Sequence, residues 1–262
     1  MPPLFDSMLH TLKQLFGKPP AAALDITSAD WARVEDGLPF LQFLPAGDRA
    51  RLRELALAFV AQKEWHGAQG LILTPDIQLC IALQACLPVL NLGLDSYRGW
   101  VGIIVYPGDF VIPRHTMDET GVVHEYDDEV AGEAWEGGPV LLSWFDRPEE
   151  ADGMNVVIHE FAHKLDMLNG PPDGLPPLHE DMSRQAWLAA FQPAYADFCT
   201  RVDSGKHTRM DPYAAEHPAE FFAVMSEAFF ETPLLLREDY PSVYEQLRLF
   251  YRQDPATTSS TP

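Results

Sequence analysis

One stretch of this sequence decides the fold: Asn155-Val156-Val157-Ile158-His159-Glu160-Phe161-Ala162-His163-Lys164-Leu165-Asp166. Its two histidines are four residues apart, which places them one turn apart and about 40° apart around an α-helix, so both imidazoles can reach one ion. Glu160 projects about 100° from His159, where it is placed to accept a proton from a metal-bound water. The pattern predicts a helix that carries two zinc ligands and a general base.

The residues around this pattern predict that the helix is buried, because apolar side chains cover almost its whole circumference: Val156, Val157, Ile158, Phe161, Ala162, Leu165 and Leu168. Buried imidazoles need partners, and a metal ion satisfies two of them at once. Asp152 or Asn155 is placed to cap the start, and Asn169-Gly170-Pro171-Pro172 ends the helix. The competing interpretation, two surface histidines beside a solvated acid, fits these neighbours poorly.

A catalytic zinc site needs a third protein ligand and a fourth position for water. In one common extension, a glycine lies three residues after the second histidine and a further histidine three residues later. Asp166 and Asn169 occupy those positions here, which excludes that version. The third ligand is therefore expected on another helix.

A second helix is predicted from His217 to Glu231, opened by Pro218 and stopped before Thr232-Pro233. Glu220 and Glu227 are seven residues apart and lie on nearly one face of it. One of the two is expected to be the third ligand, and the other, together with Asp166, to orient a liganding histidine. The alternative, that both acids lie on an exposed stripe, stays open at this point.

Length and composition describe an ordinary globular chain: 262 residues, 47% hydrophobic and 22% charged. The formal net charge of −21 disfavours direct binding to nucleic acid or to an anionic membrane. It is compatible with a basic protein partner, although a soluble acidic surface is the simpler interpretation.

The cysteines and the two ends of the chain predict the cellular compartment and the bounds of the domain. Cys80, Cys86 and Cys199 form no Cys-x-x-Cys pair and predict inert thiols in a reducing, cytoplasmic compartment. Residues 1–23 predict an amphipathic helix and a linker rather than a signal sequence, and no stretch is long and apolar enough for a membrane span. We expect one domain over 24–254 and a disordered tail over 255–262.

Local signals predict helices beginning at Ser28, at Pro45 and after Thr74. Trp100–Tyr106 and Phe110–Ile112 predict a hairpin about Pro107-Gly108-Asp109, and Pro139–Trp144 predicts a third strand. Residues 115–137 are rich in acids and glycine and predict a solvated loop or short strands.

These motifs carry a family resemblance. Asn155–Asn169, Asp211-Pro212-Tyr213-Ala214-Ala215 and the segment from Pro218 to Glu227 resemble the Mlc titration factor A family of bacterial zinc metallopeptidases. The similarity covers most of the chain, including Gly138–Trp144 and Phe250–Pro255, and leaves out the two ends. The resemblance is specific because the metal helix, the tyrosine segment and the glutamate helix occur in order.

The resemblance implies an α+β fold of the zincin-like metallopeptidase type, with a small mixed sheet packed on the metal-binding helix and a mainly helical second lobe. The family's catalytic domain is similar to that of anthrax lethal factor, in which a tyrosine precedes the third-ligand glutamate by seven residues. Tyr213 and Glu220 match that spacing. By resemblance, His159, His163 and Glu220 hold Zn2+, Glu160 is the general base, Tyr213 stabilises the oxyanion, and Glu227 stands behind the ligands.

The resemblance also implies a function, a zinc-dependent peptidase, of which an aminopeptidase is one form. In proteases of this architecture the substrate lies extended beside an edge strand, and Val140–Trp144 is the candidate strand. Family members are described as binding the glucose-system repressor Mlc. The chain could therefore instead be a regulatory binding protein that sequesters a transcription factor, with little or no peptidase activity. A purely structural zinc would need a fourth protein ligand, and none is visible near the motif.

Overall fold

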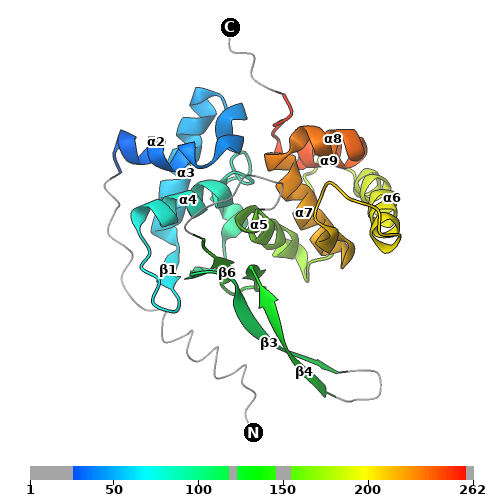
Figure 1. Ribbon diagram of the computed structural model, residues 1–262. Coiled ribbons are helices and arrows are strands. Elements are labelled where there is room, and N and C mark those ends of the chain that lie inside the picture. Colours follow the sequence, from blue (N-terminus) through cyan, green and yellow to red (C-terminus); the bar gives the residue numbers. More distant parts are fainter. Residues whose placement is uncertain (1–25, 118–122, 146–154, 258–262) are drawn as a thin grey trace.

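The structure is a computed structural model that describes residues 26–117, 123–145 and 155–257 (Figure 1). Its helices are α2 (Ser28–Asp36), α3 (Ala46–Gln62), α4 (Pro75–Cys86), α5 (Val156–Asp166), α6 (Arg184–Asp203), α7 (Pro218–Glu231), α8 (Pro233–Asp239) and α9 (Pro241–Tyr251). Its strands are β1 (Glu64–Gly67), β2 (Gly102–Tyr106), β3 (Phe110–Met117), β4 (Val123–Val130), β5 (Gly132–Ala134) and β6 (Val140–Ser143). The helix predicted near the N-terminus lies outside the described residues.

Side-chain caps explain where several helices begin. Thr27 forms a capping box with Asp30 at the start of α2, and the Thr74 hydroxyl accepts the N–H of Ile77 at the start of α4. The Asn155 side chain accepts the N–H of Ile158 at the start of α5, over 2.9 Å. The predicted beginnings of α2, α3, α4 and α5 are confirmed, because caps and prolines act within one turn of the chain.

A four-stranded sheet with the order β1-β2-β6-β5 packs against α5. The strands β1, β2 and β6 are parallel, and β5 runs antiparallel to β6, so the sheet is mixed as expected. Every residue of β6 is buried, and so is β2 up to Val105, which is typical of inner strands covered on both faces. The sheet and the surrounding helices together make the chain an α+β protein.

The predicted hairpin about residues 107–109 is wrong. Both edges of β2 are already paired, one with β1 and the other with β6, so β3 cannot pair with it. Instead β3 pairs with β4 over eight positions, from Phe110↔Val130 to Met117↔Val123. This two-stranded ribbon projects away from the helices (Figure 1). Among its described residues, the segment 115–137 contains the last three residues of β3 and all of β4 and β5, so of the two predicted alternatives the strands are confirmed and the loop is wrong.

The expectation that Val140–Trp144 is an edge strand is also wrong. Within the described sheet β6 lies between β2 and β5, and the edge beside α5 is β5. The cause is the short turn after Ala134, which folds β5 back onto the free side of β6. The edge strand that was predicted over residues 140–144 is therefore formed by residues 132–134.

After residue 183 the described chain is mainly helical, with α6 to α9 in order, and α7 packs directly on α5. All residues of α7 from Phe221 to Phe230 are buried. One hydrophobic core extends from Trp31 in α2 to Ala256, beyond the predicted domain end at 254. Ala256 is held by its backbone N–H, which donates to the Tyr244 hydroxyl over 3.0 Å. Within the described ranges, no helix is both long enough and apolar enough to cross a bilayer.

The loop between α5 and α6 fixes the first turn of α7 against the end of α5. Gly174 donates its N–H to Asp166 over 2.7 Å, and its carbonyl accepts the indole N–H of Trp187 over 3.0 Å. Its φ is +80°, and an added Cβ would lie 2.5 Å from the Pro218 carbonyl oxygen. Only glycine combines this backbone conformation with so close an approach to α7.

We expect Gly174→Ala to lower the free energy of unfolding by about 2 kcal/mol or more, because it adds a backbone clash to an unfavourable φ. Gly205→Ala is the matched control, since Gly205 also has a positive φ, +66°, but its added Cβ would meet nothing within 4 Å. Urea unfolding of both variants measures the difference. Equal losses would show that the contact with Pro218 has no energetic role.

Candidate metal centre

The helix α5 presents His159 and His163 on one face, as the i, i+4 spacing requires. Their Nε2 atoms are 3.1 Å apart, and their rings are inclined at 75°. His163 is buried, with 7% of its surface exposed. The two imidazoles therefore point at a common position beside the helix rather than into solvent.

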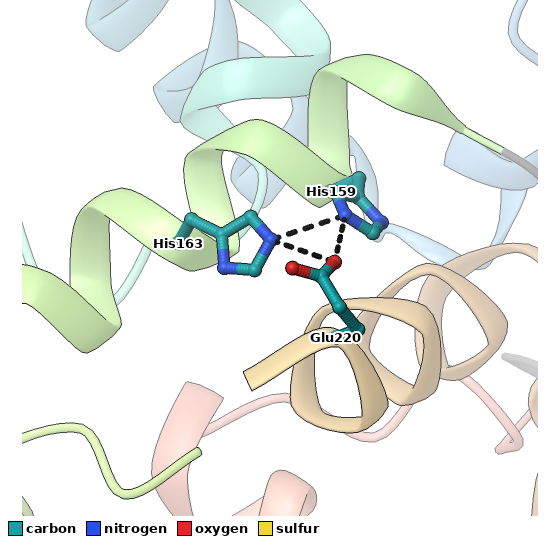
Figure 2. Close-up of side chains that lie close together, drawn as sticks. All are labelled: His159, His163 and Glu220. Carbon is teal, nitrogen blue, oxygen red and sulfur yellow. Dashed lines mark hydrogen bonds and ion pairs between the residues drawn. The ribbon is translucent and has the colours of Figure 1, made fainter. Parts of the chain in front are cut away.

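The helix α7 brings one carboxylate to that position (Figure 2). Oε2 of Glu220 lies 3.0 Å from His159 Nε2 and 3.1 Å from His163 Nε2. Glu227 lies on the far side of His159, where its Oε1 is 2.7 Å from Nδ1. The sequence left the two glutamates as alternative ligands. In the structure Glu220 faces both Nε2 atoms, whereas Glu227 contacts only Nδ1 of His159, on the side away from the centre.

The three donor atoms fit a metal ion. They form a triangle with sides of 3.0, 3.1 and 3.1 Å, and within the described parts of the chain they are the one group of this kind that could hold a metal. Two ligands of a tetrahedral ion, each about 2.0–2.1 Å from it, lie roughly 3.3 Å apart. Two imidazoles and one carboxylate are donors typical of transition-metal sites, and three of them leave a coordination position open.

Protonation around His159 supports this fit. When the Glu227 carboxylate accepts a hydrogen bond from Nδ1, the other ring nitrogen, Nε2, faces the centre and is left to take a proton or a metal ion. Burial opposes protonation, but the hydrogen bonds to Glu220 and Glu227 raise the pKa of His159 well above its ordinary value. Burial also opposes ionisation of Glu220, yet the two histidines hold the pKa of that carboxyl well below its usual range. Charges that favour a proton on Nε2 equally favour a metal cation there.

Glu160 lies beside this triangle and not in it. Its side chain is 5% exposed, and burial raises the pKa of its carboxyl. It contacts β5 so closely that a Cβ on Gly132 would lie 2.6 Å from Glu160 Oε1. A buried carboxyl with a raised pKa next to a candidate metal site is suited to accept and release a proton near neutral pH.

Tyr213 lies near the centre, next to the ring of His159. It belongs to a 3₁₀ turn, Pro212–Ala215, whose start is held by Asp211 Oδ1 accepting the Tyr213 N–H over 2.9 Å. Its ring centroid is 6.1 Å from that of His159, and 51% of its surface is exposed. Partial burial and the charges of Glu220 and Glu160 raise the pKa of Tyr213, so the phenol keeps its proton.

The expected role of Asp166 in orienting a histidine is not found. Asp166 accepts the N–H of Gly174, and among the described residues neither its Oδ1 nor His163 Nδ1 has a hydrogen-bond partner. Asp166 lies three residues after His163 but serves the loop before α6. Its position on the helix predicted that it would lie close to His163, but its hydrogen bond is to the loop that contains Gly174.

Sequence reasoning missed several residues that support the centre. The backbone N–H of Asn155 donates to Glu227. Its Nδ2 donates to Gln84 in α4 and to Glu231 in α7, over 2.7 Å in each case, so Asn155 links Glu227 to α4. Asn155 was identified only as a cap, and nothing in the pattern around Gln84 distinguished it from other helix residues. Gly132 was missed because β5 was not predicted, so no local signal connected it to Glu160.

Comparison with known proteins agrees with this geometry. The family described as Glucose-regulated metallo-peptidase M90 matches residues 17–252. Mlc titration factor A from Yersinia pestis (strain Pestoides F) and Mlc titration factor A from Yersinia pseudotuberculosis serotype O:1b (strain IP 31758) are each 39% identical to the chain over 224 residues. The match covers 83% of this chain and 82% of each relative, which confirms the predicted resemblance. The chain therefore belongs to the glucose-regulated metallopeptidase family M90.

Proposed function

We propose that this protein is a zinc-dependent peptidase whose ion is held by His159, His163 and Glu220. The observation that carries the proposal is the convergence of these three donors within hydrogen-bond distance of one another, with the buried carboxyl of Glu160 beside them. Zinc is the preferred ion because two imidazoles, one carboxylate and one open position are a common catalytic zinc arrangement.

The catalytic roles follow from chemistry and position. When bound, zinc supplies a Lewis acid that activates water and polarises the scissile carbonyl. Glu160 accepts the proton of the attacking water and later delivers it to the leaving amine, a task for which its raised pKa suits it. The Tyr213 hydroxyl, which keeps its proton, donates a hydrogen bond to the carbonyl oxygen as negative charge develops there.

The finer features of the fold and substrate belong to the same proposal. We place catalysis in one zincin-like domain over 24–254, supported by a large core that runs from Trp31 to Ala256, two residues past this end, and by a mixed sheet packed on α5. The substrate chain lies extended along the edge strand β5, next to Glu160. An aminopeptidase form belongs to the same proposal, and the comparison of free with N-acetylated peptides below tests it.

The Glu160→Gln variant tests the base. We expect it to keep zinc and to lose peptide hydrolysis by about 10²–10⁴-fold in kcat, because the amide cannot accept the proton. The measurement is turnover of short chromogenic peptides, free and N-acetylated, by protein of known zinc content, with and without a chelator. Undiminished turnover by the zinc-loaded variant would remove Glu160 from this role.

Glu227 is proposed to hold His159 in the correct tautomer. In Glu227→Gln one donor, either His159 Nδ1 or the Asn155 N–H, must face an amide NH2, so we expect zinc affinity to fall by roughly 10–100-fold. Glu231→Gln is the matched control, because Glu231 lies one turn later on α7 and contacts Asn155 rather than His159. Competition with a chromogenic chelator measures both affinities. Equal affinities in the two variants would contradict the role of Glu227.

A second candidate function is regulatory binding of the repressor Mlc in the cytoplasm. It is favoured by the name of the relatives, Mlc titration factor A, and by a net charge of −21, which suits a partner that itself binds DNA. In this form the peptidase activity is weak or absent. One protein can have both functions if the metal centre and the surface that binds Mlc are separate.

His159→Ala separates the two functions. We expect folded His159→Ala protein to bind purified Mlc as the wild type does while losing peptide hydrolysis, because the substitution removes one ligand and leaves the surface unchanged. Analytical ultracentrifugation of the mixture measures binding, and circular dichroism verifies the fold. Loss of Mlc binding in the folded variant would place the repressor contact at the metal centre.

A further inference from the structure

One face of α5 is directed at the edge strand and not at the metal ligands. Val156, Glu160 and Lys164 are spaced four residues apart and therefore lie along this face. Val156 and Glu160 contact Gly132 in β5, while Lys164 reaches the turn that joins β5 to β6. The strand is thus held by the helix at two points, its beginning and the turn after its end.

Lys164 makes the contact at the turn. Its Nζ donates to the carbonyl oxygens of Trp135 and Gly138, the latter over 2.8 Å, and lies 4.7 Å from the centroid of the Trp100 ring. Only 4% of the residue is exposed. A buried amine is costly unless its donors are satisfied, so these carbonyls are bound firmly to the helix. Trp135 and Gly138 also bond each other across the turn, over 3.0 Å.

Gly132 makes the contact at the beginning of β5. A Cβ there would lie 2.6 Å from Oε1 and 2.7 Å from Cγ of Glu160, and 2.7 Å from Cγ2 of Val156. The backbone of β5 therefore rests directly on the side chain of Glu160 with no space between them. Any displacement of the strand changes the room available to that carboxyl.

We propose that Lys164 is a positioning residue that holds the β5–β6 hairpin on α5 and thereby keeps Gly132 against Glu160, fixing the direction of its carboxylate. The inference rests on the proposed peptidase function, in which Glu160 is the base. Lys164 itself touches no reacting atom. Its effect passes through the backbone of three strand residues and one side-chain contact.

Lys63 offers a matched control for Lys164. It is 7% exposed, and its Nζ donates to two carbonyls, Tyr97 and Trp100, each over 2.8 Å. It also lies against the Trp100 ring, 3.5 Å from the centroid. Lys63 thus resembles Lys164 as a buried amine that binds two carbonyls beside Trp100, but its carbonyls precede β2, whereas those of Lys164 follow β5. Methionine at either position removes the donors while keeping most of the side-chain volume.

The experiment compares Lys164→Met with Lys63→Met in zinc-loaded full-length protein. We expect both to lose similar thermal stability, whereas only Lys164→Met lowers kcat, by about 10–100-fold, as misplacement of a catalytic group does. Zinc content and KM should be unchanged in both. Hydrogen exchange measured by mass spectrometry should be faster over residues 132–138 in Lys164→Met alone, a readout that does not depend on activity.

A second variant tests the strand contact itself. Gly132→Ala places a methyl group where the side chains of Glu160 and Val156 now lie, and the flexible carboxyl of Glu160 must move away. We expect a comparable loss of kcat with normal exchange in the hairpin, because Lys164 still holds the turn. Normal kcat in this variant, or equal kcat in the two lysine variants, would overturn the proposal while leaving the peptidase function standing. Zinc-loaded wild type without any hydrolysis would overturn both.

Discussion

The carboxylate of Glu227 joins α5 to α7 at the place on which the metal centre depends. One oxygen is 2.7 Å from His159 Nδ1, and the other accepts the backbone N–H of Asn155 at the start of α5. A carboxylate buried this completely is stable only when its oxygens are hydrogen-bonded. The contact sets the distance between the helices and the proton position on His159. It also sets the direction in which Nε2 meets Glu220, two turns earlier on α7.

The other faces of α5 explain why this helix is buried almost all round. Phe161 packs on the rings of Phe59, Tyr97 and Trp100, with centroid distances of 5.6, 5.1 and 5.8 Å. The polar residues of the helix form two groups: the histidines face α7, and Glu160 and Lys164 face the β5–β6 hairpin. Because each direction is occupied, the helix cannot rotate without losing a buried bond. The proposed zinc ligands and base are therefore held in a rigid frame.

Features set by neighbouring residues were predictable, whereas those set by contacts between distant residues were not. The start of α5 at Asn155 and the start of α7 at Pro218 were predicted because caps and prolines act within one turn. The hairpin at residues 107–109 was predicted wrongly because strand pairing depends on which edge is free, and β1 and β6 had already taken both edges of β2. The edge strand was misplaced for the same reason.

The sequence by itself determined that one helix carries two histidines and a glutamate with the spacing of a metal site, and that a second helix carries two glutamates on nearly one face. Helix geometry is a property of neighbouring residues, so these conclusions needed no tertiary contact. Only the tertiary structure decided that Glu220 faces the imidazoles while Glu227 stands behind His159, and that Gly132 rests on Glu160. Those contacts join residues far apart in the chain, and packing alone selects them.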